Sequence, residues 1–149
     1  MKVLVQRVSR GAVRIDGECV GTVGRGFVAL VGVRAEDREE DAVHLAQKTA
    51  ALRVFPDAQD RMNLALAEVG GGVLAVSQFT LYADTHKGNR PSFIRAGPPE
   101  LALRLYERYV EALRAILGPD RVATGRFAAR MEVELVNDGP VTIELTTDA

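Results

Sequence analysis

The sequence predicts an α+β fold, with a largely antiparallel or mixed sheet and two main helices in a single domain over residues 1–149. Strand-like runs occupy both ends of the chain, and two segments between them carry apolar residues at helical spacing. A length of 149 residues is typical of one domain that can bury a substantial core. We therefore expect one site, or one kind of shared site.

The first 33 residues contain two predicted strand pairs, 2–10 with 12–16 and 18–23 with 26–33. Asp16-Gly17 and the glycines of residues 24–26 separate them, as turn residues do in β-hairpins. The expected strands are KVLVQRVSR at 2–10, AVRID at 12–16, ECVGTV at 18–23 and GFVALVGV at 26–33. This pattern predicts that the chain opens with antiparallel sheet.

A first helix is predicted from residue 36 to about residue 54. Acidic residues at its start suit the positive end of a helix dipole. Residues with helical spacing then follow, namely Ala42, Val43, Leu45, Ala46, Thr49, Ala50 and Leu52. Phe55-Pro56-Asp57 ends the helix, and the polar stretch that follows it predicts a loop.

The run VLAVSQFTLYA at 73–83 predicts a central strand that is buried on both faces. The next stretch, DTHKGNRPSFIRAGPP, has no periodicity and contains His86, Lys87, Arg90 and Arg95. It predicts a long loop, and long ordered loops tend to be functional.

A second helix is predicted to begin at Pro98-Pro99 and to end at Gly118-Pro119, because apolar residues recur at every fourth position between them. Two further strands, MEVELVN at 131–137 and VTIELTT at 141–147, flank NDGPVT. Gly139-Pro140 raises a question there, because proline removes a backbone donor where both neighbours are expected to pair in a sheet.

The composition excludes several classes of protein. No apolar run approaches the roughly 20 residues of a membrane span, and Gln6 and Arg7 interrupt what would be the core of a signal peptide. With Cys19 alone no intramolecular disulfide can form, so we expect a cytoplasmic protein without a membrane partner. A net charge of −1 gives no broad basic field, so we expect no DNA partner and only local contact with RNA.

Motifs for the common catalytic chemistries are absent from the sequence. No metal-ligand spacing, nucleophile elbow, phosphate loop or dinucleotide fingerprint occurs, so we expect neither a metal nor a cofactor. His44 and His86 both suit surface positions better than that of a catalytic base. Ser77 and Thr80 remain as polar residues at the end of a buried strand, either as ordinary hydrogen-bonded strand residues or as groups presented to a cleft.

Several short motifs occur in order along nearly the whole chain, and the two main ones are SQFTL and NDGPVT. The set is QRV at 6–8, MN at 62–63, SQFTL at 77–81, RPSF at 90–93, TGRFAA at 124–129 and NDGPVT at 137–142. Together these motifs resemble the D-aminoacyl-tRNA deacylase family of the D-Tyr-tRNA deacylase type.

The resemblance implies a compact, barrel-like α+β homodimer that hydrolyses the ester between a D-amino acid and the terminal adenosine of tRNA. Ser77, Gln78, Phe79 and Thr80 would form the pocket. The Gly139-Pro140 bond would be cis and would enter the active site of the other subunit, where its carbonyls exclude L side chains.

By the same resemblance, Arg7 would brace the Gly-Pro segment by donating to carbonyls, with an outward-facing strand arginine as the alternative. Gln78 would form hydrogen bonds within the pocket. Glycine should pass the filter, because it lacks the side chain that the filter excludes.

The lack of a base fits an ester that is already activated, because a neighbouring ribose 2′-hydroxyl can activate water while the enzyme orients the ester. Amides around Phe79 and Thr80 could stabilise the oxyanion. The competing mechanism makes Thr80 a covalent nucleophile, although no adjacent base is evident.

The RNA contacts leave alternatives open. Lys87, Arg90 and Arg95 could bind acceptor-end phosphates or remain solvated loop charges. Phe93 could stack on the terminal adenine or anchor a small core. A non-catalytic nucleic-acid-binding dimer and a general ester hydrolase with Thr80 as nucleophile are the rival functions.

Overall fold

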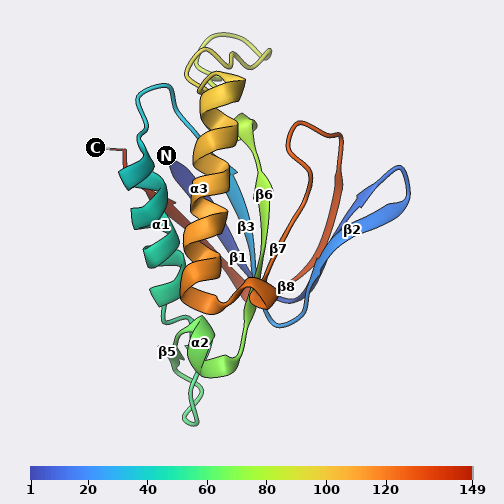
Figure 1. The fold of residues 1–149 in the computed structure, drawn as a ribbon, viewed down its shortest axis with the longest axis vertical. Helices are drawn as coiled ribbons and strands as arrows, with labels where there is room; N and C mark the ends of the chain where they lie inside the picture. Colours follow the sequence, from blue (N-terminus) through green and yellow to red (C-terminus); the bar gives the residue numbers. More distant parts are fainter. Residues whose placement is uncertain (149) are drawn as a thin grey trace.

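A computed structural model describes residues 1–148 and has the predicted α+β architecture, in which a strongly curved mixed sheet packs against two long helices (Figure 1). The order along the chain is β1 (Lys2–Ile15), β2 (Glu18–Val23), β3 (Gly26–Gly32), α1 (Glu39–Ala51), β4 (Phe55–Pro56), β5 (Met62–Leu64), α2 (Leu66–Val69), β6 (Gly72–Ser77), the 3-10 turn η1 (Phe79–Tyr82), α3 (Pro99–Leu117), the 3-10 turn η2 (Pro119–Arg121), β7 (Val122–Thr124) and β8 (Glu132–Thr146).

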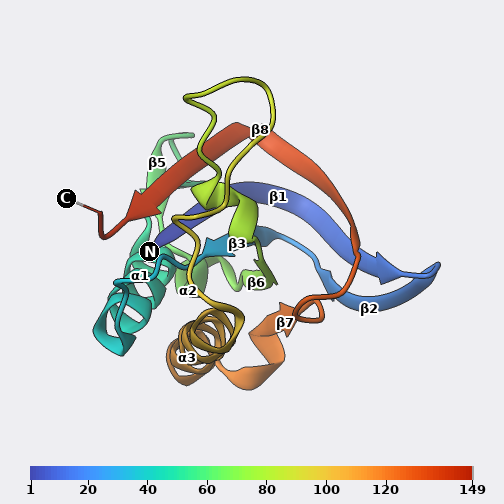
Figure 2. The same ribbon diagram turned by 90° about the horizontal axis from the view of Figure 1, so that it is seen from above.

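The main sheet has the order β2-β1-β3-β6-β7, and β8 pairs with β1. β1 is antiparallel to β2, β3 and β8, whereas β3, β6 and β7 are parallel. Seen from above, β8 follows the outer side of β1 along a shared arc (Figure 2). β2 and β7 come close enough nearly to close a small barrel, because a Cβ on Gly21 would lie 2.4 Å from the carbonyl oxygen of Thr124.

The core lies mainly between the sheet and helices α1 and α3, which run side by side on one face (Figure 1). Every second side chain of a strand points to that face of the sheet. A smaller apolar cluster, which includes Val28 and Leu74, fills the opposite, concave face. α3 has the predicted bounds, since Pro99 lies in its first turn and its apolar stripe is buried. Within residues 1–148 no helix combines the length and apolar character needed to cross a membrane.

Several predicted elements differ from the structure. Residues 2–10 and 12–16 were predicted as a pair of strands but form the single strand β1, because β8 pairs with it on both sides of Gly11. β2 and β3 were predicted to pair with each other, but each of them pairs with β1, which lies between them. The first helix spans Glu39–Ala51 rather than 36–54, since the carboxylate of Asp41 caps the amide of Arg38. The predicted loop after it contains the β4–β5 hairpin.

The two strands predicted around NDGPVT are also one element, β8. The register of its pairing with β1 shifts between Gln6↔Thr142 and Val8↔Asn137. The residues between Asn137 and Thr142 therefore have no partner in the ladder and lie opposite Arg7 alone. Gly139-Pro140 is therefore a bulge within a strand and not a hairpin tip, which reconciles proline with the ladder on both sides.

Candidate active site

A pocket of about 670 Å³ opens at the carboxyl end of β6. Its lining includes three of the four residues expected there, Ser77, Gln78 and Phe79. The rest of the wall comes from the ends of β3 and β6, the loop before α3, the start of α3, and residues 127–133. The end of a buried strand, a loop and a helix terminus thus converge on one cavity.

The segment after Ser77 turns away from the sheet, so the strand predicted over 73–83 was too long. β6 ends at Ser77. The amide of the next residue, Gln78, donates to the carbonyl of Val31 at 2.8 Å, and η1 begins at Phe79. Amides in the first turn of a helix have no partner within it. Phe79, which lines the pocket, and Thr80, which follows it and does not, occupy those positions, so their amides are free of partners within the turn.

Thr80 is exposed, and its hydroxyl accepts a hydrogen bond from the side-chain amide of Gln78. A carboxamide cannot act as a base for that hydroxyl. His44 and His86 are both exposed and do not line the pocket; His86 lies 3.6 Å from Asp84. Among residues 1–148, no group of three or more His, Cys, Asp and Glu side chains could hold a metal ion.

Two phenylalanines form the mouth of the pocket. The rings of Phe79 and Phe93 meet edge to face with centroids 4.9 Å apart, and they are 54% and 38% exposed. Such exposure of two large apolar rings in contact is typical of a binding surface. The backbone pairing of Asp84 with Ser92 at 2.7 and 2.9 Å holds the loop that carries Phe93.

The basic residues of this loop lie in two places. Lys87 and Arg90 are exposed within the 85–91 stretch. Arg95 lies nearer the sheet, with its guanidinium carbon 5.8 Å from the centroid of the Tyr82 ring. The loop rises above the carboxyl end of β6 before it enters α3 (Figure 1).

Residues 127–133 form a wall that was not predicted as part of the site. Phe127, Ala128, Ala129 and Met131 line the pocket, and Ala128 has a φ of 62°. A left-handed alanine is unusual and marks a backbone that its surroundings hold in place. The motif TGRFAA covered only the first three residues of this segment, and no residue type in the segment indicates a pocket wall.

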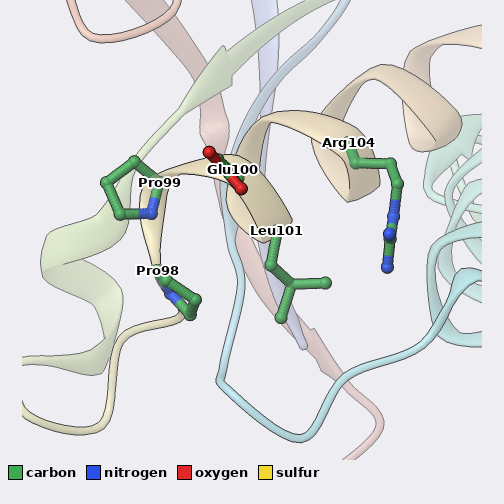
Figure 3. A pocket seen from close by; sticks show the side chains of 5 residues that line it. All are labelled: Pro98, Pro99, Glu100, Leu101 and Arg104. Atoms are coloured by element: carbon green, nitrogen blue, oxygen red, sulfur yellow. The ribbon is translucent and has the colours of Figure 1, made fainter.

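A second hollow of about 600 Å³ lies at the start of α3 (Figure 3). Pro98 and Pro99 line both hollows, and Glu100, Leu101 and Arg104 complete the second. The two prolines therefore form a ridge between the main pocket and this open surface.

The Gly139-Pro140 peptide bond is cis. Arg7, which is 8% exposed, donates from Nε to the carbonyl of Asp138 at 3.1 Å and from Nη1 to the carbonyl of Val54. Gly139 has a φ of 124°, and a Cβ there would lie 2.9 Å from Nη2 of Arg7. Arg7 therefore holds the bulge against the sheet, and the bulge requires glycine at this position.

Gly139-Pro140 and the pocket do not meet within one chain. Arg7, opposite the bulge, pairs with Phe27, which pairs with Val73, and Ser77 lies four residues farther along β6. The distance from the bulge to Ser77 therefore includes roughly 13 Å along the strands, at about 3.3 Å per residue. It also includes three steps of about 4.8 Å across the sheet, from β8 to β1, β3 and β6. The two main motifs therefore lie at different places on one subunit.

Comparisons with known proteins confirm the family resemblance. The sequence profile of the family described as D-Tyr-tRNA(Tyr) deacylase matches residues 4–146. A D-aminoacyl-tRNA deacylase of Anaeromyxobacter dehalogenans is 59% identical over 145 residues, 97% of this chain and 96% of the relative. That of Symbiobacterium thermophilum is 56% identical over 148 residues, 99% and 97% of the two chains.

Two solved structures share the fold over nearly their whole length. One, of a protein named c-Myc DNA Unwinding Element Binding Protein, is 40% identical with a TM-score of 0.95 and full coverage of both chains. The other, of a probable eukaryotic D-amino acid tRNA deacylase, is 18% identical with a TM-score of 0.83 and covers 97% of each chain.

Proposed function

The chain belongs to the D-Tyr-tRNA(Tyr) deacylase family, and on that premise we propose that it hydrolyses the ester bond of D-aminoacyl-tRNA to release a D-amino acid and free tRNA. The protein is a hydrolase of the D-aminoacyl-tRNA deacylase type. The observation that carries the proposal is the family match over residues 4–146, within which the SQFT segment opens onto the pocket. Such an enzyme would act as a proofreading step in translation in the cytoplasm.

The chirality filter is proposed to act between two subunits of a homodimer. Gly139-Pro140 would enter the pocket of the other copy, where backbone carbonyls bind the α-ammonium group of the substrate and leave no room for an L side chain. The separation of the bulge from its own pocket supports this arrangement, because a filter on the same chain could not reach the substrate. Arg7 would hold the filter in place.

For the chemical step we propose substrate-assisted hydrolysis. The amides of Phe79 and Thr80 would stabilise the oxyanion, while the ribose 2′-hydroxyl assists the attacking water. The partner of the Thr80 hydroxyl is a carboxamide rather than a base, which supports this route over a threonine nucleophile. Ser77 and Gln78 would shape the pocket floor.

The tRNA is proposed to approach over the 84–97 loop. Lys87, Arg90 and Arg95 would contact acceptor-end phosphates, and Phe93 would stack on the terminal adenine beside Phe79. Side chains of many D-amino acids would project outward. Glycyl-tRNA would also be cleaved, because glycine has no side chain for the filter to exclude.

Deacylation time courses on D-Tyr-tRNA and L-Tyr-tRNA, with chelator present, test this function. Loss of the D ester with the L ester spared is expected, and glycyl-tRNA should be cleaved as well. Cleavage of both Tyr esters would remove the filter from the mechanism. Cleavage of small activated esters without regard to configuration would favour a general esterase.

The rival function is a non-catalytic nucleic-acid-binding dimer. The protein of the 40% identical structure is named for binding a DNA element, so duplex DNA binding is a specific comparison to make. Tight DNA binding without deacylation of D-Tyr-tRNA would favour this rival. A net charge of −1 and intact SQFT and Gly-Pro segments support the enzyme instead.

A further inference from the structure

Tyr82 ends the η1 turn, two residues after Thr80, and it is only 1% exposed. It does not line the pocket. It nevertheless connects three parts of the chain that surround the pocket turn, through separate contacts of its hydroxyl and its ring. The proposed chemistry gives no role to this residue.

The hydroxyl of Tyr82 donates to the carboxylate of Asp148, with O–O distances of 3.0 and 3.2 Å. Asp148 follows β8, and its carboxylate also lies 3.6 Å from Nη2 of Arg34, two residues after the end of β3. A hydrogen bond to a charged acceptor is stronger than one between neutral groups. The Tyr82–Asp148 hydrogen bond therefore connects the η1 turn to the segments that follow β8 and β3.

The ring of Tyr82 contacts two cations. Nζ of Lys2 lies 5.0 Å from the ring centroid, and the guanidinium carbon of Arg95 lies 5.8 Å from it. Both distances are within the range of cation–π attraction. Arg95 belongs to the basic loop, in which Ala96 also forms an isolated bridge with Arg34, two residues after β3 ends. The ring thus contacts Arg95 of the loop and Lys2 of β1, whereas the hydroxyl contacts Asp148 after β8.

We propose that Tyr82 is a positioning residue for the deacylation reaction, whose hydroxyl fixes the turn that presents the Phe79 and Thr80 amides and whose ring holds Arg95. This inference rests on the proposed function. The two roles are separable, because phenylalanine keeps the ring and loses only the hydroxyl. Preorganised amides act on the transition state, whereas the loop acts on tRNA binding.

Tyr82→Phe should therefore lower kcat about tenfold with little change in KM, because small displacements of groups that contact the transition state cost rate. Tyr82→Leu should lower kcat similarly and also raise KM several-fold, since Arg95 loses its ring. Asp148→Asn weakens the same hydrogen bond from the other side, and it should reproduce the kcat effect even if Tyr82→Phe folds poorly.

Tyr109→Phe is the matched control. Its hydroxyl is buried and lies 2.8 Å from Oγ1 of Thr49, between α1 and α3 and away from the pocket. This variant loses one buried hydroxyl contact as Tyr82→Phe does, so both should lose thermal stability. Only Tyr82→Phe should lower kcat, and only it should speed amide hydrogen exchange in residues 79–97.

The outcomes separate the two proposals. If the wild-type protein leaves D-Tyr-tRNA intact, the proposed function fails. If the wild type cleaves it but Tyr82→Phe and Tyr109→Phe have equal kcat and equal exchange in residues 79–97, Tyr82 has only a structural role and this inference is wrong. A Tyr82→Phe variant that changes KM alone would also overturn it.

Discussion

Replacing Arg7 with methionine should make the enzyme less stable and less selective. Methionine keeps an unbranched apolar stem but removes both donors. The carbonyl of Val54, in a buried residue, then loses its partner, and so does the carbonyl of Asp138. One unsatisfied buried acceptor costs about 1–3 kcal/mol. We expect a loss of about 2 kcal/mol, which lowers the Tm of a domain of this size by roughly 6 °C.

The effect on selectivity follows from the same contacts. Without the hydrogen bond from Arg7, the bulge that carries Gly139 is no longer fixed against β1. The ratio of D-Tyr-tRNA to L-Tyr-tRNA deacylation rates should then fall by about tenfold or more, because the proposed filter depends on the position of Gly139-Pro140. Thermal unfolding and paired deacylation time courses measure the two effects.

Arg10→Met is the matched control on the same strand. Arg10 is exposed and pairs with Glu134, and such surface pairs are worth about 0–1 kcal/mol. This variant should keep its Tm and its D/L ratio. An Arg7→Met protein that loses stability while its D/L ratio stays at the wild-type value would refute the bracing role of Arg7. Equal loss of selectivity in both variants would do the same.

Three further predictions concern other parts of the molecule. Gly21→Ala should cost about 1–3 kcal/mol in thermal unfolding, because its Cβ would lie 2.4 Å from the Thr124 carbonyl oxygen, whereas Gly24→Ala has open space and should be neutral. Thr80→Ala should keep measurable deacylation without an acyl-enzyme in mass spectra; complete loss of activity, with an acyl-enzyme trapped in the wild type, would establish a nucleophile. Burial alone would raise the pKa of Asp148, but hydrogen bonds from the amino terminus and a tyrosine hydroxyl hold it below its usual value. The ionised Asp148 carboxylate stabilises the fold at pH values above its usual pKa, and this stabilisation is lost as the pH falls through the lowered pKa of the folded state. Below about pH 4, the Tm of Asp148→Asn should therefore fall less than the Tm of the wild type.

Local sequence patterns predicted a helix or strand well where its structure depends on the spacing of the apolar residues along one of its own faces. α3 follows its fourfold apolar spacing between Pro99 and Gly118, and β2 and β3 lie close to their predicted positions. These patterns failed where the extent of a strand depends on pairing with another strand that is distant in the sequence. Gly11 does not interrupt β1, because β8 pairs on both sides of it.

The site was predictable only in part for the same reason. The SQFT motif lies at the pocket turn, but the apolar run after Ser77 concealed the change from strand to 3-10 turn. The Gly-Pro motif was predicted to separate two strands, whereas it forms a bulge within one. The left-handed Ala128 and the wall around it have no signal in residue type. That the two motifs lie apart on one subunit follows only from the register of four strands.

The pairing of β1 with β8 also has a consequence for the order of folding. Residues 2–14 find their partners at 132–146, across nearly the whole chain. Contacts of such long sequence separation form slowly, and the ribosome delivers the partner strand last. β3 and β6, which carry the pocket turn, are synthesised well before the bulge exists. The nascent chain should therefore form β3 and β6 before it can form the segment that we propose distinguishes one hand of substrate from the other.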